Sequence, residues 1–182
     1  MSLLDLSKLE SGTMSMKKGT VAVGQLLSDV AATLAPKARK RSIEIECTVE
    51  AGLPDVQGDP DRLRQVFVNL VDNAVKFSSE GGRISISARR RPESVEVRIS
   101  DQGVGIPRAD QQRIFSKFYR AESPGPGVHG TGLGLFLARG LLLAMGGKIW
   151  VESREGQGST FVLELPAGAS GAVSAAPEKV TA

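Results

Sequence analysis

The chain has 182 residues, of which 41% are hydrophobic and 24% charged, a composition typical of one globular domain with a short appendage. The net charge of +3 and the aromatic content of 4% disfavour a strongly electrostatic nucleic-acid or membrane binder. A single cysteine and a single histidine exclude an internal disulfide, a multi-cysteine zinc site and a two-histidine metalloprotease helix. Because no apolar run approaches the roughly 20 residues that span a bilayer, we expect a cytoplasmic domain with no nucleic-acid partner.

Residues 3–10 form the first predicted element, a short amphipathic helix that ends before Gly12. A helix of this length is marginal in water by itself. We therefore interpret residues 1–12 as the end of a longer helix.

The next elements follow from changes in apolar periodicity. Residues 23–40 have helical spacing, and residues 42–49 alternate as a strand does. A long helix is predicted for residues 59–77, with Asp59 at its cap and Pro60 in its first turn, where proline is tolerated.

The second half of the chain predicts two hairpins around a helix. Residues 84–88 and 95–99 alternate as strands, and residues 148–152 and 159–165 do so again. Between them, residues 133–145 are almost wholly apolar and predict a helix buried on most sides.

This order of elements predicts an α+β fold, a two-layer α/β sandwich. About three helices are expected to cover one face of a mixed, mostly antiparallel sheet. We expect one domain over residues 13–166 and a disordered tail over residues 167–182, which are small and polar.

The helix over residues 59–77 carries a second, polar stripe. At 100° per residue, Asn69, Asn73 and Lys76 fall within roughly a 60° arc opposite the apolar face. Amide oxygens are hard, neutral metal ligands and a lysine offsets phosphate charge, so this stripe suits a magnesium triphosphate. Taken alone, such a stripe is more typical of a solvated helix face, because amphipathic helices are common.

A second candidate follows the strand that ends at Ser100. Asp101 can accept a hydrogen bond from an exocyclic amine such as that of adenine. Gly103 and Gly105 let the backbone turn sharply and approach a flat ring. The alternative at this point is a plain Asp-Gly turn.

A third candidate is the glycine-rich run over residues 130–135, Gly-Thr-Gly-Leu-Gly-Leu, where a loop enters the apolar helix. Free backbone N–H groups and the helix dipole favour an anion there. The run lacks the Gly-Lys-Ser/Thr ending of a P-loop, and it lacks the preceding strand of the dinucleotide fingerprint.

Between these motifs, residues 114–120 read Ile-Phe-Ser-Lys-Phe-Tyr-Arg. Phe115 and Phe118 are candidates to anchor a flap, or are simply core residues, and Lys117 and Arg120 are candidates to reach phosphate. Residues 123–129 contain two prolines and two glycines, so we expect a lid that is poorly ordered without nucleotide.

Together, these four segments resemble the N, G1, F and G2 boxes of the catalytic domain of sensor histidine kinases, in the family's order and spacing. The resemblance covers residues 13–166, and residues 5–12 look like the end of the dimerisation helix that precedes that domain. It implies the Bergerat ATP-binding fold with ATP and Mg²⁺ as cofactors.

The resemblance also implies a role for each box. Asn73 would bind Mg²⁺, Asn69 and Lys76 would meet the phosphates, and Asp101 would hold the adenine amine. The implied ATP site as a whole comprises Asn69, Asn73, Lys76, Asp101, Gly103, Gly105, Ile106, Phe118, Tyr119, Arg120, Gly130, Thr131, Gly132, Leu133, Gly134, Leu135 and Ser159.

The implied partners are ATP or ADP, the protein's own dimerisation domain with its phosphoacceptor histidine, and the receiver domain of a response regulator. The full-length protein would be a homodimer, and this fragment a monomer. The acceptor helix is absent here, and the single histidine, His129, lies in the lid without an acceptor-like motif. The sequence leaves open the input signal, the cognate regulator, phosphorylation within or between subunits, and a membrane anchor.

Two alternatives remain, a Bergerat-type ATPase and a regulatory pseudokinase. Position 69 bears on the ATPase and on anti-sigma-type kinases, because these typically carry a glutamate there as a base and Asn69 has no useful basicity. It does not exclude a pseudokinase, since an inactive homologue could keep all four boxes intact. A transfer whose acceptor brings its own base needs only positioning and charge stabilisation from this site. We therefore expect the histidine kinase function.

Overall fold

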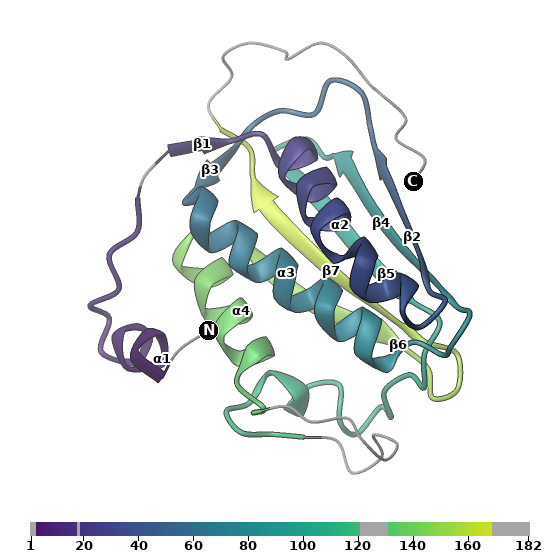
Figure 1. The fold of residues 1–182 in the computed structure, drawn as a ribbon. Helices are drawn as coiled ribbons and strands as arrows, with labels where there is room; N and C mark the ends of the chain where they lie inside the picture. Colours follow the sequence, from purple (N-terminus) through teal and green to yellow (C-terminus); the bar gives the residue numbers. More distant parts are fainter. Residues whose placement is uncertain (1–2, 18, 121–130, 169–182) are drawn as a thin grey trace.

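Three helices lie across one face of a five-stranded sheet (Figure 1). The computed structural model describes residues 3–17, 19–120 and 131–168, and its helical layer consists of α2 (Val23–Arg39), α3 (Pro60–Phe77) and α4 (Gly134–Ala144). The predicted two-layer α/β sandwich is confirmed. α3 lies between α2 and α4 and packs against both, so its side chains are placed from two sides.

The sheet has the strand order β2-β4-β5-β7-β6. The strands are β2 (Glu44–Val49), β4 (Arg83–Arg90), β5 (Ser94–Asp101), β6 (Lys148–Ser153) and β7 (Ser159–Pro166). β2 and β4 run parallel and every other pair in this sheet is antiparallel, as the expected mixed, mostly antiparallel sheet requires. The central strand β5 ends at Asp101, which lies opposite Ile84 of β4 and Ser159 of β7.

Three short elements were not predicted from the sequence. β1 (Gly19–Val21) pairs antiparallel with β3 (Val56–Gly58), and a single 3-10 turn, η1, covers Arg113–Phe115. Three residues are too few to show an alternating pattern. The β1–β3 ribbon holds the chain entering α2 beside the chain entering α3, with Val56 fully buried.

The predicted start of α3 is confirmed in atomic detail. The Asp59 side chain accepts hydrogen bonds from the backbone N–H groups of Asp61 at 3.0 Å and Arg62 at 3.2 Å, with Pro60 in the first turn. Burial raises the pKa of Asp59, but bonds from the N–H groups of Lys17, Arg62 and Asp61 outweigh burial and hold that pKa below its usual value. The cap fixes where the helix begins and hence which side chains form the polar stripe.

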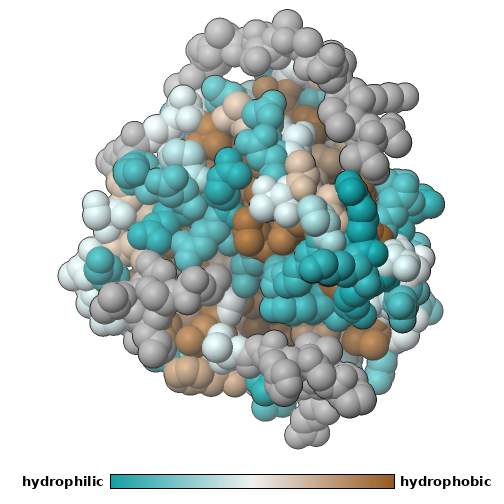
Figure 2. Space-filling view, in the orientation of Figure 1, coloured by the Kyte–Doolittle hydropathy of each residue, from teal (hydrophilic) through white to brown (hydrophobic). Residues whose placement is uncertain are grey.

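α4 is less enclosed than its composition predicts. Leu137, Leu141 and Leu142 are buried, but Leu143 is 57% exposed. This helix is covered by the sheet and α3 on one side and meets solvent on another, so the expectation of burial on most sides was wrong for its last turn. Figure 2 shows the face of the molecule that the helices cover, and hydrophobic patches lie there among hydrophilic residues.

α1 (Leu3–Glu10) lies against α4 rather than in the main core. Leu6 forms a separate buried cluster with Leu133 and Leu137. A Cβ atom at Gly140 would lie 2.2 Å from Leu9 Cδ2, so the glycine provides the space that Leu9 fills. In the part of the chain that the structure describes, no helix is both long and apolar enough to cross a membrane.

Candidate functional site

The C-terminal half of α3 joins two of the predicted motifs. Ser78, directly after the helix, forms a β-bridge with Gly103 of the Asp101 loop. On the side of α4, a Cβ atom at Gly134 would lie 2.3 Å from Asn69 Oδ1, so the glycine-rich run touches the polar stripe. The structure therefore brings the stripe, the Asp101 loop and the start of α4 together, as the sequence motifs require.

Asp101 is a buried carboxyl group at the end of the central strand. It is 8% exposed and accepts a hydrogen bond from the Gly103 N–H at 2.9 Å. Burial raises the pKa of Asp101 to about 6, although the N–H groups of Gly103 and Ser159 lower it. A hollow of about 330 Å³ lies beside it, lined also by Ser153, Gly158 and Ser159. A carboxylate in this position can accept a hydrogen bond from an amine that enters the hollow.

The loop after Asp101 is held so tightly that its glycines cannot be replaced freely. Gly105 has a φ of +68°, and a Cβ atom there would lie 1.9 Å from the Arg154 carbonyl oxygen. The next residue, Ile106, donates its N–H to Ser153 Oγ at 2.8 Å, and Ser153 Oγ lies 3.0 Å from Ser159 Oγ. The predicted residues Ile106 and Ser159 thus meet through Ser153, and Gly105 lies against the neighbouring Arg154.

Asn69 is the first residue of the stripe, and its side-chain amide group is not fully hydrogen-bonded. Its Nδ2 atom is buried and has no hydrogen-bond partner within the described residues. An unsatisfied buried donor destabilises the empty protein by roughly 1–3 kcal/mol, so a ligand with an acceptor oxygen would relieve that penalty. The orphaned amide is thus compatible with the phosphate contact that the resemblance implies.

Asn73 and Lys76 complete the stripe, and Lys76 is ion-paired. Its Nζ lies 2.7 Å from Asp72 Oδ2, and the other Asp72 oxygen accepts a hydrogen bond from Lys37 of α2. Burial raises the pKa of Asp72, but the bonds from Lys37 and Lys76 outweigh burial and hold that pKa below its usual value. Asp72 is therefore a charged neighbour of the site that the sequence reasoning did not single out.

The two phenylalanines of residues 114–120 lie in different surroundings. Phe115 is buried and meets Phe161 edge-on at 6.4 Å, whereas Phe118 is 60% exposed with a φ of +60°. Phe115 is thus a core residue. The Phe118 N–H donates to the Gly132 carbonyl at 3.1 Å, which places Phe118 beside the glycine-rich run.

Tyr119 and Arg120 follow on the same segment. The Tyr119 hydroxyl donates to Asp110 Oδ1 at 2.6 Å, and the Arg113 guanidinium lies 4.5 Å from the Tyr119 ring centre. Arg120 is exposed. Tyr119 is therefore oriented by its own segment rather than by the stripe.

The glycine-rich run is described from Thr131 onward. Thr131 is exposed, Leu133 is buried and Leu135 is half-buried, while Gly132 has a φ of +68° and lies against the Phe118 backbone. The lid is predicted from about Phe118 to Thr131, and its residues 121–130, with the predicted site residue Gly130 and with His129, lie outside the described residues.

Arg41 is a further residue that sequence reasoning missed. Its guanidinium donates to the carbonyl oxygens of Val75, Lys76 and Ser78, with distances of 2.8 Å to Lys76 and 3.0 Å to Ser78. It thereby satisfies the end of α3, next to the bridge with Gly103. Nothing in the sequence distinguishes Arg41 from its basic neighbours, because its partners are backbone atoms about 35 residues away.

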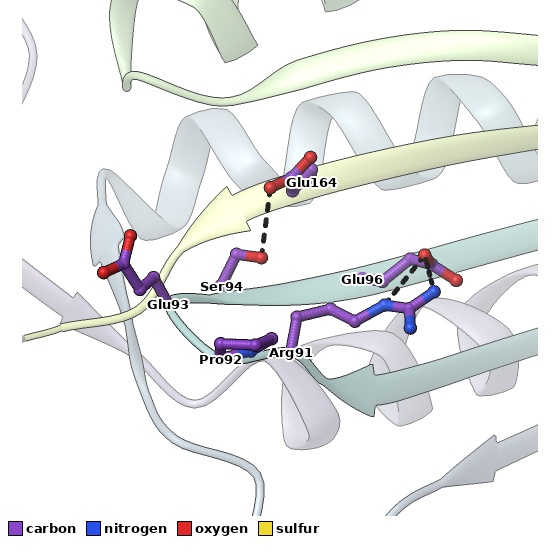
Figure 3. A pocket seen from close by; sticks show the side chains of 6 residues that line it. All are labelled: Arg91, Pro92, Glu93, Ser94, Glu96 and Glu164. Carbon is purple, nitrogen blue, oxygen red and sulfur yellow. Dashed lines mark hydrogen bonds and ion pairs between the residues drawn. The ribbon is translucent and has the colours of Figure 1, made fainter.

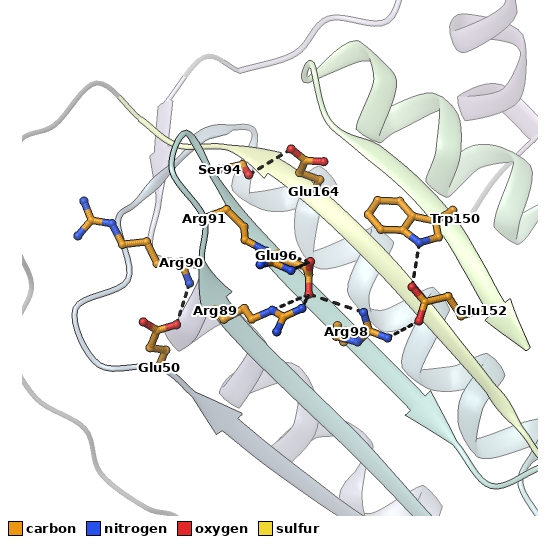
Figure 4. A network of polar contacts seen from close by, with 10 residues as sticks. All are labelled: Glu50, Arg89, Arg90, Arg91, Ser94, Glu96, Arg98, Trp150, Glu152 and Glu164. Atoms are coloured by element: carbon orange, nitrogen blue, oxygen red, sulfur yellow. Dashed lines mark hydrogen bonds and ion pairs between the residues drawn. The ribbon is translucent and has the colours of Figure 1, made fainter.

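A larger hollow of about 520 Å³ lies at the other end of β5, by the β4–β5 turn (Figure 3). Two of the residues that line it, Arg91 and Glu96, belong to a network on the open face of the sheet, in which Glu96 pairs with Arg89 and Arg91 at 2.5 and 2.6 Å (Figure 4). Burial raises the pKa of Glu96, but its bonds to Arg91 and Arg89 outweigh burial and hold that pKa below its usual value. The hollow beside Asp101 is the stronger candidate despite its smaller size, because the predicted site residues Asp101 and Ser159 line it, whereas none lines the larger hollow.

The donor set of the site fits magnesium better than zinc. Among the described residues, no group of three or more His, Cys, Asp or Glu side chains could hold a metal ion. Asn73 offers a neutral amide oxygen on the same stripe as Asn69, and Mg²⁺ in nucleotide sites takes few protein ligands together with phosphate oxygens and waters.

Comparison with known proteins identifies the family to which the chain is similar. Residues 58–169 match the family described as histidine kinase-, DNA gyrase B- and HSP90-like ATPases. The chain is 37% identical over 169 residues to the adaptive-response sensory-kinase SasA of Prochlorococcus marinus subsp. pastoris, which covers 90% of this chain and 45% of SasA. It is 39% identical over 166 residues to the signal transduction histidine-protein kinase BarA of Escherichia coli, over 87% of this chain and 18% of BarA. The chain thus spans less than half of either relative.

Solved structures are similar over most of the chain. ShkA, crystallised at full length in complex with AMPPNP, has a TM-score of 0.81 and 32% identity, covering 92% of this chain and 35% of ShkA. The catalytic domain of histidine kinase ThkA has a TM-score of 0.74 and 32% identity, covering 84% of this chain and 99% of that domain. Over the matched part, this chain therefore has the fold of a histidine kinase catalytic domain.

Proposed function

The chain belongs to the family of histidine kinase-, DNA gyrase B- and HSP90-like ATPases, and from this membership we propose that it binds Mg-ATP and presents the γ-phosphate to a histidine on a dimerisation domain. In this proposal, residues 13–166 form the ATP-binding catalytic domain of a cytoplasmic sensor kinase module, residues 1–12 end the dimerisation helix, and residues 167–182 form a tail. The phosphate would pass on to an aspartate of a response regulator. One solved neighbour, ThkA, is in complex with the response regulator TrrA, which supports this choice of partner.

The observation that carries the proposal is the position of the buried Asp101 relative to the stripe on α3. Phe77 and Ser78 end that helix and touch Gly103, while Asn69 touches Gly134. A nucleotide whose base amine meets Asp101 would extend its phosphates along α3 toward α4. Asn69, Lys76 and the backbone N–H groups at the start of α4 would then contact the phosphates.

The metal would be held by Asn73 together with phosphate oxygens. When bound, Mg²⁺ supplies neutralisation of phosphate charge. The chain's own groups supply the rest: Asp101 orients the base, and Lys76 and the Asn69 amide hold the phosphate oxygens in place. Loop residues 103–106 close one side of the base pocket.

Among the described residues of the stripe, position 69 offers no proton acceptor for the terminal phosphate. Asn69 stands at the position where a base would activate water, and an amide cannot take a proton at neutral pH. This favours transfer to a histidine that arrives with its own base over hydrolysis of ATP. It also argues against the ATPase alternative.

The proposal is tested by following phosphate from γ-labelled ATP. The chain alone should bind ATP but acquire no stable label, because no described residue is placed as nucleophile. Addition of a dimeric two-helix segment carrying the acceptor histidine should produce acid-labile label on that segment. Label on this chain that disappears in His129→Ala would contradict the proposal, and so would a failure of every acceptor segment to be labelled.

A further inference from the structure

Lys76, the ammonium group of the phosphate-binding stripe, shares its carboxylate with a second lysine. Lys76 Nζ lies 2.7 Å from Asp72 Oδ2, and Lys37 Nζ donates a hydrogen bond to Asp72 Oδ1. Lys37 belongs to α2, whereas Asp72 and Lys76 lie one turn apart on α3. One carboxylate therefore holds two ammonium groups, although a single one would neutralise it.

The second ammonium group matters because the two lysines that share Asp72 lie on different helices. Lys76 lies on the stripe with Asn69 and Asn73, and Lys37 approaches from the neighbouring helix. The Asp72 side chain is only 22% exposed, so leaving its charge without a counterion would be unfavourable. If Lys76 were the sole partner of Asp72, its movement toward a phosphate would leave the Asp72 carboxylate without a counterion.

We propose that Lys37 is a positioning residue for Lys76: it remains as the counterion of Asp72, so that the Lys76 ammonium can leave that carboxylate and turn to the phosphates. This inference rests on the proposed function, because it requires a phosphate on the stripe. It assigns a role in nucleotide affinity to a residue of α2 that does not itself belong to the stripe.

The test is the affinity of the whole chain for Mg-ATP, for Mg-ADP and for adenosine. Lys37→Met removes the charge and keeps the length of the side chain. It should weaken binding of Mg-ATP about three- to fivefold, the scale of one partly exposed ion pair, and leave adenosine binding unchanged. Lys37→Arg keeps the charge and should restore the affinity. Asp72→Asn should bind Mg-ATP at least as well as the wild type, because it releases Lys76.

A matched control exists on the same two helices. Arg64 of α3 pairs with Asp29 of α2 at 3.3 Å, and Arg64→Met removes one positive charge and one α2–α3 ion pair in the same way. It should leave the affinity for Mg-ATP unchanged. This control separates the proposed role from a general loss of positive charge or of contact between the helices.

The double variants decide between a local and a long-range effect. Lys37→Met should have no further effect on affinity when Lys76 is already methionine, or when Asp72 is already asparagine. An undiminished effect of Lys37→Met in the Lys76→Met background would overturn the inference, as would equal losses for adenosine and Mg-ATP. A wild-type chain that binds no Mg-ATP refutes the proposed function instead, whereas binding that Lys37→Met leaves intact refutes only this inference.

Discussion

Asn69 and Gly134 are in such close contact that a Cβ atom on the glycine would come within 2.3 Å of the asparagine Oδ1 atom. This relationship ties the stripe of α3 to the first residue of α4. It also explains the glycine at this helical position, where alanine would otherwise be favoured by about 1 kcal/mol.

Gly134→Ala should therefore displace the Asn69 side chain and weaken Mg-ATP binding. Loss of one hydrogen bond to a charged phosphate corresponds to roughly 1.5–3 kcal/mol, or about 10- to 100-fold in affinity. Gly140→Ala is the matched control, because its Cβ would meet only Leu9 of α1, at 2.2 Å. Calorimetric titration of both variants checks this, and equal affinities for the two variants would contradict it.

Gly105→Ala should destabilise the fold by more than Gly156→Ala. Both glycines have positive φ, +68° and +76°, so each alanine incurs about 1–2 kcal/mol of backbone strain. Only at Gly105 would the Cβ also meet backbone, 1.9 Å from the Arg154 carbonyl oxygen, whereas Gly156 has nothing within 4 Å. Urea unfolding should show the larger loss for Gly105→Ala, and similar losses would mean that the loop can move away from Arg154.

Much of the architecture could be predicted from apolar periodicity and helix caps. The helix that begins after Asp59 and ends at Phe77 was located by its cap, its proline and its apolar stripe, all of which are local signals. The ribbon of β1 and β3 was missed, because pairs such as Val21 with Val56 join three-residue segments far apart in the chain.

The site could be predicted only as far as its residues carry local patterns. The stripe and the glycine motifs are visible in the sequence, but the contact of Asn69 with Gly134 depends on how two helices pack. Arg41 gave no local signal, since its bonds reach backbone carbonyls about 35 residues away. Asp72 lies four residues before Lys76, a spacing that the sequence shows, but its bond to Lys37 joins two helices and could not be predicted from it. The prediction that α4 is buried on most sides failed at Leu143, because an apolar composition does not say how many neighbours a helix has.

Asn73→Ala should weaken binding of Mg-ATP much more than binding of ATP in the presence of a metal chelator. Loss of an outer-shell partner of a metal typically lowers affinity by about 10-fold or more, and loss of a ligand should do at least as much. Titrations with and without Mg²⁺ check this. Equal losses in both titrations would assign Asn73 to packing or hydrogen bonding rather than to the metal.

Binding of adenosine should weaken as the pH falls from 7 to 5. The pKa of Asp101 is raised to about 6 by burial, so at pH 5 only about a tenth of the molecules carry the carboxylate that accepts the adenine amine. Adenosine is the appropriate probe because it has no titrating phosphate. We expect about a tenfold loss of affinity for the wild type, and weaker, pH-independent binding for Asp101→Asn.

The same raised pKa has the opposite effect on stability. Since the folded pKa lies above the ordinary value of 3.8, the contribution of Asp101 to the free energy of unfolding is greatest below that value and is lost as the pH rises through about 6. Asp101→Asn should therefore raise the stability of the empty domain at pH 8 and not at pH 4. If the stability changes with pH as expected but the wild-type affinity for adenosine stays constant between pH 5 and 7, Asp101 does not bind the adenine base.

The most direct test of the central claim is calorimetric titration of the folded wild-type chain with Mg-ATP, with Mg-GTP as the comparison. The account predicts saturable binding of one Mg-ATP per chain with a micromolar or weaker dissociation constant, and no comparable binding of Mg-GTP, because guanine presents a carbonyl oxygen where Asp101 needs an amine. A chain that is folded by circular dichroism yet binds no Mg-ATP, or binds both nucleotides equally, would contradict it.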